Sequence, residues 1–209
     1  MQAEAYSDKI SDYLKADEVI DYEDEGIMRL ADSLYGKSRN ETEYIRNAYE
    51  FVRDRISHSA DICAEEVTCS ASEVLRKGHG ICFAKSHLLA ALLRSKEIPA
   101  GFCYQKLILE DDLAPELIMH GLNGVYLRET GKWIRLDARG NKEGVCALFS
   151  TEQEHLAFPV RPEKGERDGF TVYPDPDAYV VHVLKKYSNV DALWENLPDH
   201  LSADSAAAE

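Results

Sequence analysis

The sequence predicts an α+β fold, because the spacing of its apolar residues changes from helical to strand-like near the middle of the chain. Before residue 99, apolar residues recur at intervals of three and four, as they do on one face of a helix. After residue 100, short segments rich in aromatic and aliphatic residues follow one another without helical segments between them. Consecutive strands form an antiparallel sheet, so we expect the helices of the first half to pack against such a sheet.

The composition is that of a globular domain. The chain has 209 residues, of which 44% are hydrophobic and 30% are charged, and this is enough to bury a core. We expect one domain over residues 1–200 and a frayed tail at 201–209. A formal net charge of -14 disfavours a nucleic-acid or membrane-surface partner, because both surfaces attract basic patches. No stretch approaches the roughly 20 apolar residues of a membrane span.

The cysteines favour a reduced, cytoplasmic setting. There are five of them, an odd and widely spaced set, and the acidic start of the chain does not resemble a secretory signal. Because neither a C-x-x-C pair nor an H-E-x-x-H helix occurs, we expect no metal and no cofactor. A metal site built from Cys63, Cys69, His58 and His79 is a weak alternative, since their spacing matches no common pattern.

Three helices are expected in the first half of the chain. Asn40 with Glu43 resembles a capping box and precedes apolar residues at helical spacing, namely Ile45, Ala48, Tyr49, Val52 and Ile56. Residues 70–75 suggest a short helix that Gly78 and Gly80 stop. A third helix starts near Cys82. Its positions 84, 87, 88, 91 and 92 form one stripe, and further apolar residues predict a central helix covered on most sides.

Three strands are expected at 101–110, 120–129 and 132–140, with a hairpin turn at Glu129–Lys132 between the last two. A loop rich in proline, glycine and charge then runs from Pro159 to Pro176 and could border a cleft. Two short helices, near 177–187 and 191–197, should complete the fold.

Cys82 is the candidate nucleophile. It follows a glycine-broken turn and opens the central helix, where the helix dipole and unpaired N–H groups lower a thiol pKa. The same N–H groups can bind a developing oxyanion. Most cysteines are small core residues, and this interpretation suits Cys63, Cys69, Cys103 and Cys146. Cys82 differs in its place at the junction between turn and helix.

A nucleophilic cysteine also needs a base and a group that orients the base. His120 begins one predicted strand, and Asp137 lies on the next. A four-residue loop at 128–131 would make them diagonal neighbours on one face, whereas an odd loop without a bulge would separate them. Taken singly, His120 also suits a backbone-bonded histidine and Asp137 a turn residue. Asn123 is a weaker orienting group, because parity turns it away from His120.

Three ordered segments resemble the transglutaminase-like superfamily. They are "GHGICFAKSHLLAALLRSKEIPAGF" around the cysteine, "MHGLNGVYL" around the histidine and "GKWIRLDARG" around the aspartate, and "YEFVRDRISHSADI" resembles the helix that precedes them. The resemblance covers roughly residues 44–140. It implies a papain-like fold of the kind found in small bacterial members, with Cys82 as nucleophile, His120 as base and acid, and Asp137 as orienting carboxylate.

The resemblance leaves the reaction open. We expect a cysteine-dependent acyl-transfer enzyme that acts on a peptide or protein amide, with water as the acceptor. The rival interpretations are a cysteine peptidase and a non-catalytic domain that binds a peptide or partner on the same fold. The family's second oxyanion donor has no clear counterpart; His79 and Gln105 are candidates, and each also suits a structural role.

Overall fold

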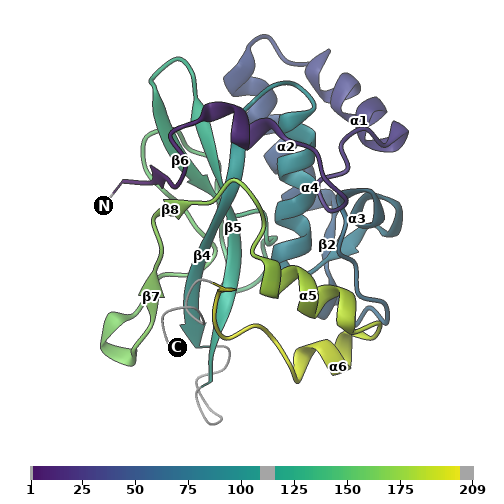
Figure 1. The fold of residues 1–209 in the computed structure, drawn as a ribbon, viewed down its shortest axis with the longest axis vertical. Helices are drawn as coiled ribbons and strands as arrows, with labels where there is room; N and C mark the ends of the chain where they lie inside the picture. Colours follow the sequence, from purple (N-terminus) through teal and green to yellow (C-terminus); the bar gives the residue numbers. More distant parts are fainter. Residues whose placement is uncertain (1, 109–115, 203–209) are drawn as a thin grey trace.

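The computed structural model describes residues 2–108 and 116–202. Its main sheet has four antiparallel strands in the order β6-β5-β4-β7. Their bounds are Ala100–Ile108 for β4, Leu117–Leu127 for β5, Lys132–Leu136 for β6 and Arg167–Asp168 for β7. The α+β prediction, with helices packed on an antiparallel sheet, is confirmed (Figure 1). The expected tail lies, from residue 203 onward, outside the described residues, as do the last two residues of the first expected strand.

Four helices precede the sheet. They are α1 (Glu25–Tyr35), α2 (Glu41–Arg55), α3 (Ala71–Lys77) and α4 (Cys82–Arg94). The sequence analysis gave no bounds for α1, whose N-cap Asp24 accepts hydrogen bonds from the N–H groups of Gly26 and Ile27. Helix α2 starts as expected, because the Asn40 side chain accepts from the N–H of Glu43 at 2.8 Å.

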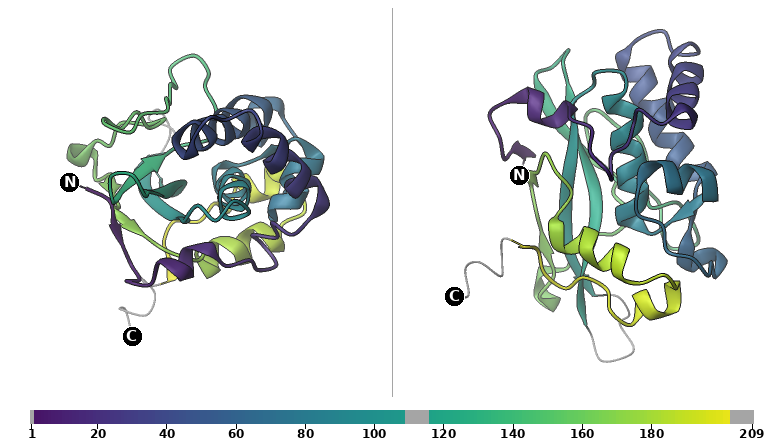
Figure 2. Two further views of the ribbon diagram at one scale, coloured as in Figure 1. Left: turned by 90° about the horizontal axis from the view of Figure 1, so that it is seen from above. Right: turned by 45° about the vertical axis from the view of Figure 1, so that its right-hand side comes forward.

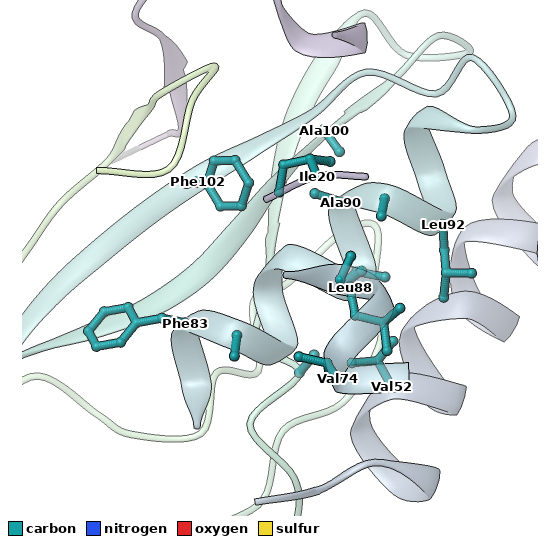
Figure 3. Close-up of a cluster of buried hydrophobic side chains, with 14 of the residues drawn as sticks. Ile20, Val52, Val74, Phe83, Leu88, Ala90, Leu92, Ala100 and Phe102 are labelled. Atoms are coloured by element: carbon teal, nitrogen blue, oxygen red, sulfur yellow. The ribbon is translucent and has the colours of Figure 1, made fainter. Parts of the chain in front are cut away.

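Helix α4 lies between the sheet and the other helices (Figures 1 and 2). All of its residues are buried, as expected for a helix that is apolar on most sides. Figure 3 shows Phe83, Leu88 and Leu92 of this helix among side chains from α2, α3 and β4. Enclosure of this kind holds the first turn of α4, and with it Cys82, in a fixed place.

The polar side chains of α4 are bonded to backbone groups around the helix. Lys85 donates to the carbonyl of Ile56, just beyond α2, and Ser86 Oγ donates to the Cys82 carbonyl at 2.9 Å. Arg94 donates to the Ala100 carbonyl at 3.0 Å through Nε. Buried polar groups are tolerated when they are bonded in this way, so these contacts anchor both ends of the helix.

Short strands join segments that are far apart in sequence. A parallel pair, β2 (Ser57–His58) with β3 (His79–Gly80), connects the exit of α2 to the entry of α4. Strands β1 (Glu4–Ala5) and β8 (Thr171–Val172) form a second parallel pair. The segment expected as a loop from Pro159 to Pro176 therefore contains β7 and β8, and β7 lines up with β4. Both are too short to give a period-two pattern.

The chain finishes with α5 (Ala178–Lys186) and α6 (Val190–Trp194), close to the expected positions. Each begins with a side-chain cap, from Asp177 and Asn189 respectively. Trp194 and Leu197, at and just beyond the end of α6, line the same cavity as Cys82. Within the described residues, no helix is long and apolar enough to cross a membrane.

Candidate active site

Cys82 is the first residue of α4, as the sequence predicted. The preceding Ile81 is extended and provides no side-chain cap, and no acidic side chain occurs in the first turn. The N–H groups of this turn are therefore not satisfied by a capping side chain, and they retain their capacity to bind an anion. Cys82 itself is 9% exposed and lines a cavity.

The two glycines before Cys82 have different roles. Gly78 ends α3 with a φ of 73°, in the left-handed region that favours glycine. Gly80 instead lies in β3, and a Cβ placed there would come within 3.1 Å of both Ala84 Cβ and Thr68 Oγ1. The first glycine turns the chain, and the second lets it pass close to the first turn of α4.

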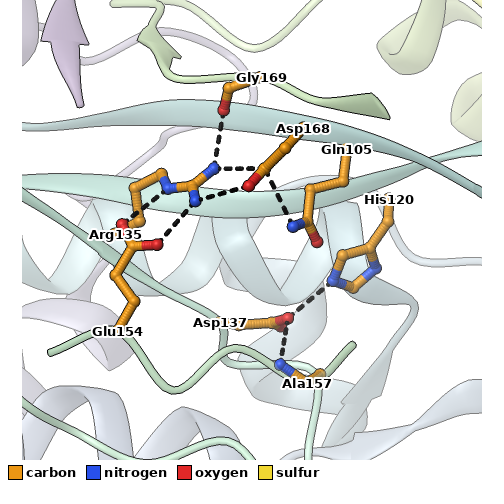
Figure 4. Close-up of polar contacts among 8 residues, drawn as sticks. All are labelled: Gln105, His120, Arg135, Asp137, Glu154, Ala157, Asp168 and Gly169. Carbon is orange, nitrogen blue, oxygen red and sulfur yellow. Dashed lines mark hydrogen bonds and ion pairs between the residues drawn. The ribbon is translucent and has the colours of Figure 1, made fainter. Parts of the chain in front are cut away.

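His120 and Asp137 meet as the four-residue connection predicted. Strand β5 pairs with β6 so that Leu127 faces Lys132 and Asn123 faces Leu136, which makes residue 137 a diagonal neighbour of residue 120. The distance from His120 Nε2 to Asp137 Oδ2 is 2.8 Å (Figure 4). Both side chains are almost completely buried.

Asp137 is fixed by further hydrogen bonds from the backbone. Its Oδ2 accepts from the N–H of Ala157 at 3.0 Å, and its Oδ1 accepts from the N–H of Arg139 at 3.1 Å. Burial alone would raise the pKa of this carboxyl, but the charge of His120 and these hydrogen bonds outweigh burial and lower it. Asp137 is therefore an ionised group that holds the imidazole in one orientation.

His120 interacts with Cys82 as well as with Asp137. Burial lowers the pKa of His120, but the charges of Asp137 and Cys82, with hydrogen bonds to both, reverse the effect and raise it to about 10. Nε2 is bonded to Asp137, and in Figure 4 the second ring nitrogen points away from that carboxylate. The structure thus joins His120 to Asp137, and it places Cys82 and His120 on the wall of one cavity.

A cavity of about 520 Å³ opens beside Cys82 and His120. Most of its wall is apolar, with Leu107, Ile108, Ile118, Met119 and Phe158 among the lining residues. The ring of Phe158 stands edge-on to the imidazole of His120, with 5.2 Å between centroids. Asp137 does not line this cavity, so a bound molecule can meet the sulfur and the imidazole but not the carboxylate. The size suits a small ligand or a few residues of a peptide.

Neither of the two expected oxyanion donors lies on this cavity. His79 Nδ1 is 3.0 Å from Ser59 Oγ, and Gln105 Nε2 donates to Asp168 Oδ1 at 3.0 Å. Both side chains make structural contacts instead. The expectation that one of them is the second oxyanion donor is therefore wrong, and the structural role is the correct one. Asn123 donates to the carbonyls of Ser86 and Gly101 and does not approach His120.

His58 is a cavity residue that the sequence analysis considered only as a metal ligand. It pairs with Gly80 in the β2–β3 ladder, two residues before Cys82, and it lines the cavity. Its Nδ1 is buried without a hydrogen-bond partner. Burial, assisted by the charge of Arg139, lowers the pKa of His58 to about 3, so its imidazole is neutral. Its position just after α2, in the segment that resembles the family, is the sequence feature that could have identified His58 as a site residue.

A second polar cluster, built around the buried Arg135, supports the sheet behind His120 (Figure 4). Arg135, whose side chain is 1% exposed, binds Asp168 at 2.6 Å and Glu154 at 2.7 Å. Gln105, the cross-strand neighbour of His120, donates to the same Asp168. This cluster does not line the cavity. Its charged and polar groups bind one another and are not available to a ligand there.

All five cysteines are unpaired. Among residues 2–108 and 116–202, no group of three or more histidine, cysteine or acidic side chains is arranged to hold a metal ion. The weak alternative of a site from Cys63, Cys69, His58 and His79 therefore finds no support in the described part of the chain.

Comparison with known proteins agrees with this architecture. A sequence profile of the Transglutaminase-like superfamily matches residues 28–138, just over half of the chain. The chain belongs to the transglutaminase-like superfamily, as its three motifs predicted. A search of curated proteins for related sequences found no match.

Solved structures resemble parts of this chain at low sequence identity, and the first of the two below shares its fold. A provisionally assigned cysteine protease from Cytophaga hutchinsonii superposes with a TM-score of 0.52 and 20% identity, over 64% of this chain and 43% of that one. The periplasmic domain of TgpA from Pseudomonas aeruginosa gives a TM-score of 0.44 at 15% identity, over 60% of this chain and 45% of that one. The present chain spans less than half of either protein, so the likeness concerns the fold of the common part.

Proposed function

We propose that this chain is a cysteine-dependent enzyme that transfers the acyl group of an amide through a thioester, with water as the final acceptor. The observation that carries the proposal is the His120–Asp137 pair next to Cys82 at the wall of one cavity. A buried imidazole with a raised pKa beside a cysteine at a helix N-terminus favours a thiolate–imidazolium pair.

In the first half of the reaction, the Cys82 sulfur attacks the carbonyl carbon of the amide. A C–S bond forms and the carbonyl electrons move to the oxygen, where the N–H of Cys82 stabilises the negative charge. Imidazolium His120 then gives its proton to the leaving nitrogen, and the C–N bond breaks. In the second half, His120 takes a proton from water, which attacks the thioester and releases a carboxylic acid. The thiolate–imidazolium pair is restored.

His58 is the second oxyanion donor in this scheme. A neutral imidazole carries one N–H. The His58 ring lies on the cavity wall, and its buried Nδ1 has no hydrogen-bond partner in the protein. The β2–β3 register brings it to the backbone that enters α4. A preorganised donor of this kind, in a site that excludes water, is worth more than one in solution.

The main rival is a cysteine peptidase, which would use the same residues on a backbone amide. The description of the Cytophaga hutchinsonii structure as a provisional cysteine protease favours it. A panel of peptides, set against glutamine and asparagine side-chain amides, separates the two by the bond that is hydrolysed. For either enzyme, a peptide or protein is the expected substrate, and the five unpaired cysteines favour a cytoplasmic location.

The decisive experiment traps the thioester. The protein is incubated with the amide panel, quenched in acid and digested, and the peptide that contains Cys82 is weighed by mass spectrometry. We expect an acyl adduct on Cys82 that is absent from Cys82→Ala and that decays by hydrolysis. If Cys82→Ala binds the same peptides as the wild type and neither protein turns over any amide, the chain is a binding domain instead.

A further inference from the structure

Among the residues that the structure describes, the lining of the cavity beside Cys82 has more basic than acidic side chains, although the chain as a whole is strongly acidic. They are Arg139, Lys142 and Arg161 against Asp61 and Glu166, whereas the formal net charge of the chain is -14. An acidic protein repels anions in general. A local reversal of sign therefore marks a place where a negatively charged group is retained.

The excess is found at Asp61 and not at Glu166. Glu166 is paired with Arg161, whose Nη2 is 2.5 Å from Glu166 Oε1. Asp61, by contrast, meets two cations. Arg139 binds both of its oxygens, at 2.5 and 2.9 Å, and Lys142 Nζ lies 2.8 Å from Oδ1. We call Asp61, Arg139 and Lys142 the Asp61 cluster.

The cluster combines a fixed cation with an adjustable one. The Arg139 side chain is 7% exposed and is held by its two-pronged contact with Asp61. The Lys142 side chain is 50% exposed. Its ammonium has three donors, and Asp61 accepts one hydrogen bond from it. Lys142 can therefore keep its bond to Asp61 and still donate to a ligand.

The Asp61 cluster lies close to the reacting groups, because each of its two chain segments also carries a residue of the site. Arg139 follows Asp137 by two residues, and its N–H donates to Asp137 Oδ1. Asp61 follows His58 by three residues, and the charges of Arg139 and Asp61 both act on the His58 imidazole. A charged group held by the cluster would thus lie in the same cavity as the amide under attack. The apolar lining from β4 and β5 faces the remainder of a substrate.

We propose that the Asp61 cluster binds a carboxylate of the substrate, and that the preferred substrate is an acidic, peptide-like amide with an apolar group beside the reacting bond. This inference rests on the proposed function, because it concerns the substrate of that same site. It accounts for a surplus cation at the cavity of an acidic protein, where an apolar ligand alone would need none.

The test compares two alkylating agents that differ mainly in charge. Thiolate sulfur displaces iodide from either iodoacetate or iodoacetamide, and the ratio of the two rates at Cys82 reports the local potential. We expect Lys142→Gln to lower the iodoacetate-to-iodoacetamide ratio about two- to fivefold, and Lys142→Glu to lower it further, with smaller differences at high salt. Lys37→Gln, at an exposed lysine away from the cavity, is the matched control and should leave the ratio unchanged.

The outcomes separate the two proposals. A ratio that is the same in the wild type and in both Lys142 variants overturns the carboxylate site, while rapid reaction of Cys82 with iodoacetamide leaves the proposed function standing. If Cys82 reacts with iodoacetamide no faster than a free-cysteine peptide, the proposed function fails and the substrate assignment fails with it. A substrate pair that differs by glutamate against glutamine beside the apolar group gives an independent check: the wild type should prefer the acid, and Lys142→Gln should lose that preference.

Discussion

Cys82 and Cys103 are both buried, but their surroundings differ, and the proposed function requires opposite chemistry of the two thiols. Cys103 lies within β4 and is completely buried among apolar residues such as Leu122 and Val172. Burial raises the pKa of its thiol to about 12. Cys82 opens α4 at the edge of a cavity that His120 also lines, and its charge helps to raise the pKa of His120. Burial makes a thiol inert unless a cation is buried with it.

Cys69 shows that nearness to a helix start is not sufficient. It immediately precedes Ser70, the N-cap of α3, and its backbone N–H donates to Glu73 Oε2 at 3.0 Å. Burial still raises its thiol pKa to about 12. An acidic residue occupies the first turn of α3, whereas none occupies that of α4. The difference between the two helix starts is therefore the partner charge, and the experiments below test that difference.

The largest expected effect separates the two buried cysteines directly. Cys82→Ala should reduce turnover about 10⁴-fold or more, because the nucleophile is lost. Cys103→Ala should retain the activity of the wild type per folded molecule and reduce the free energy of unfolding by about 1 kcal/mol, since it only removes packing. The measurements are the turnover and the urea unfolding of both variants. Equal losses of activity would show that Cys82 and Cys103 do not differ in function.

The next effect concerns two aspartates, the buried Asp137 and the half-buried Asp168. Asp137→Asn should reduce turnover by about 10² to 10⁴-fold, because an amide neither fixes nor stabilises the imidazolium as a carboxylate does. Asp168→Asn is the control, since it removes an ionised partner of Arg135 in the cluster that does not face the cavity. It should reduce stability and leave turnover of the folded fraction unaltered. A similar kinetic loss in both variants would mean that the sheet, and not the His120 contact, is what matters.

A smaller effect is expected at His58. His58→Ala should lower kcat about 10² to 10³-fold with little change in KM, because an oxyanion donor acts mainly in the transition state. His58→Gln keeps an N–H donor and should recover part of the loss. If His58→Ala raises KM and leaves kcat intact, His58 belongs to substrate binding and not to oxyanion stabilisation.

A further effect is on the pH dependence of stability. The pKa of His120 is raised from its ordinary 6.5 to about 10 in the folded chain, so the folded state holds the proton more tightly. Its contribution to the free energy of unfolding is fully present below pH 6.5 and is lost as the pH rises through 10. The wild type should therefore lose stability between these values relative to His120→Gln. His182→Gln, at an exposed histidine, should follow the wild type.

Much of the site could be predicted from the sequence because it depends on local rules. The start of α4 follows from glycine punctuation and an apolar run, and the contact of His120 with Asp137 follows from the even length of the connection at 128–131. Family motifs added the order of the three residues. None of these inferences required knowledge of distant packing.

The missed features depend on contacts between distant segments. The β2–β3 pair has only two residues in each strand, too few for any periodic signal, yet it brings His58 to Cys82. His79, one of the two candidate donors, is instead bonded to Ser59 and does not line the cavity. The Asp61 cluster also joins residues about 80 positions apart. The limits of the domain at residues 1–200 remain a prediction.

Site-resolved labelling with iodoacetamide near pH 6 tests the central claim most directly. At this pH ordinary thiols react slowly, because the thiolate is the reacting species. We expect the wild type to be modified selectively at Cys82, and the selectivity to disappear in His120→Ala but to persist in His182→Ala. Slow and uniform labelling of all five cysteines in the wild type, or selective labelling of Cys82 that survives the loss of His120, would contradict the account.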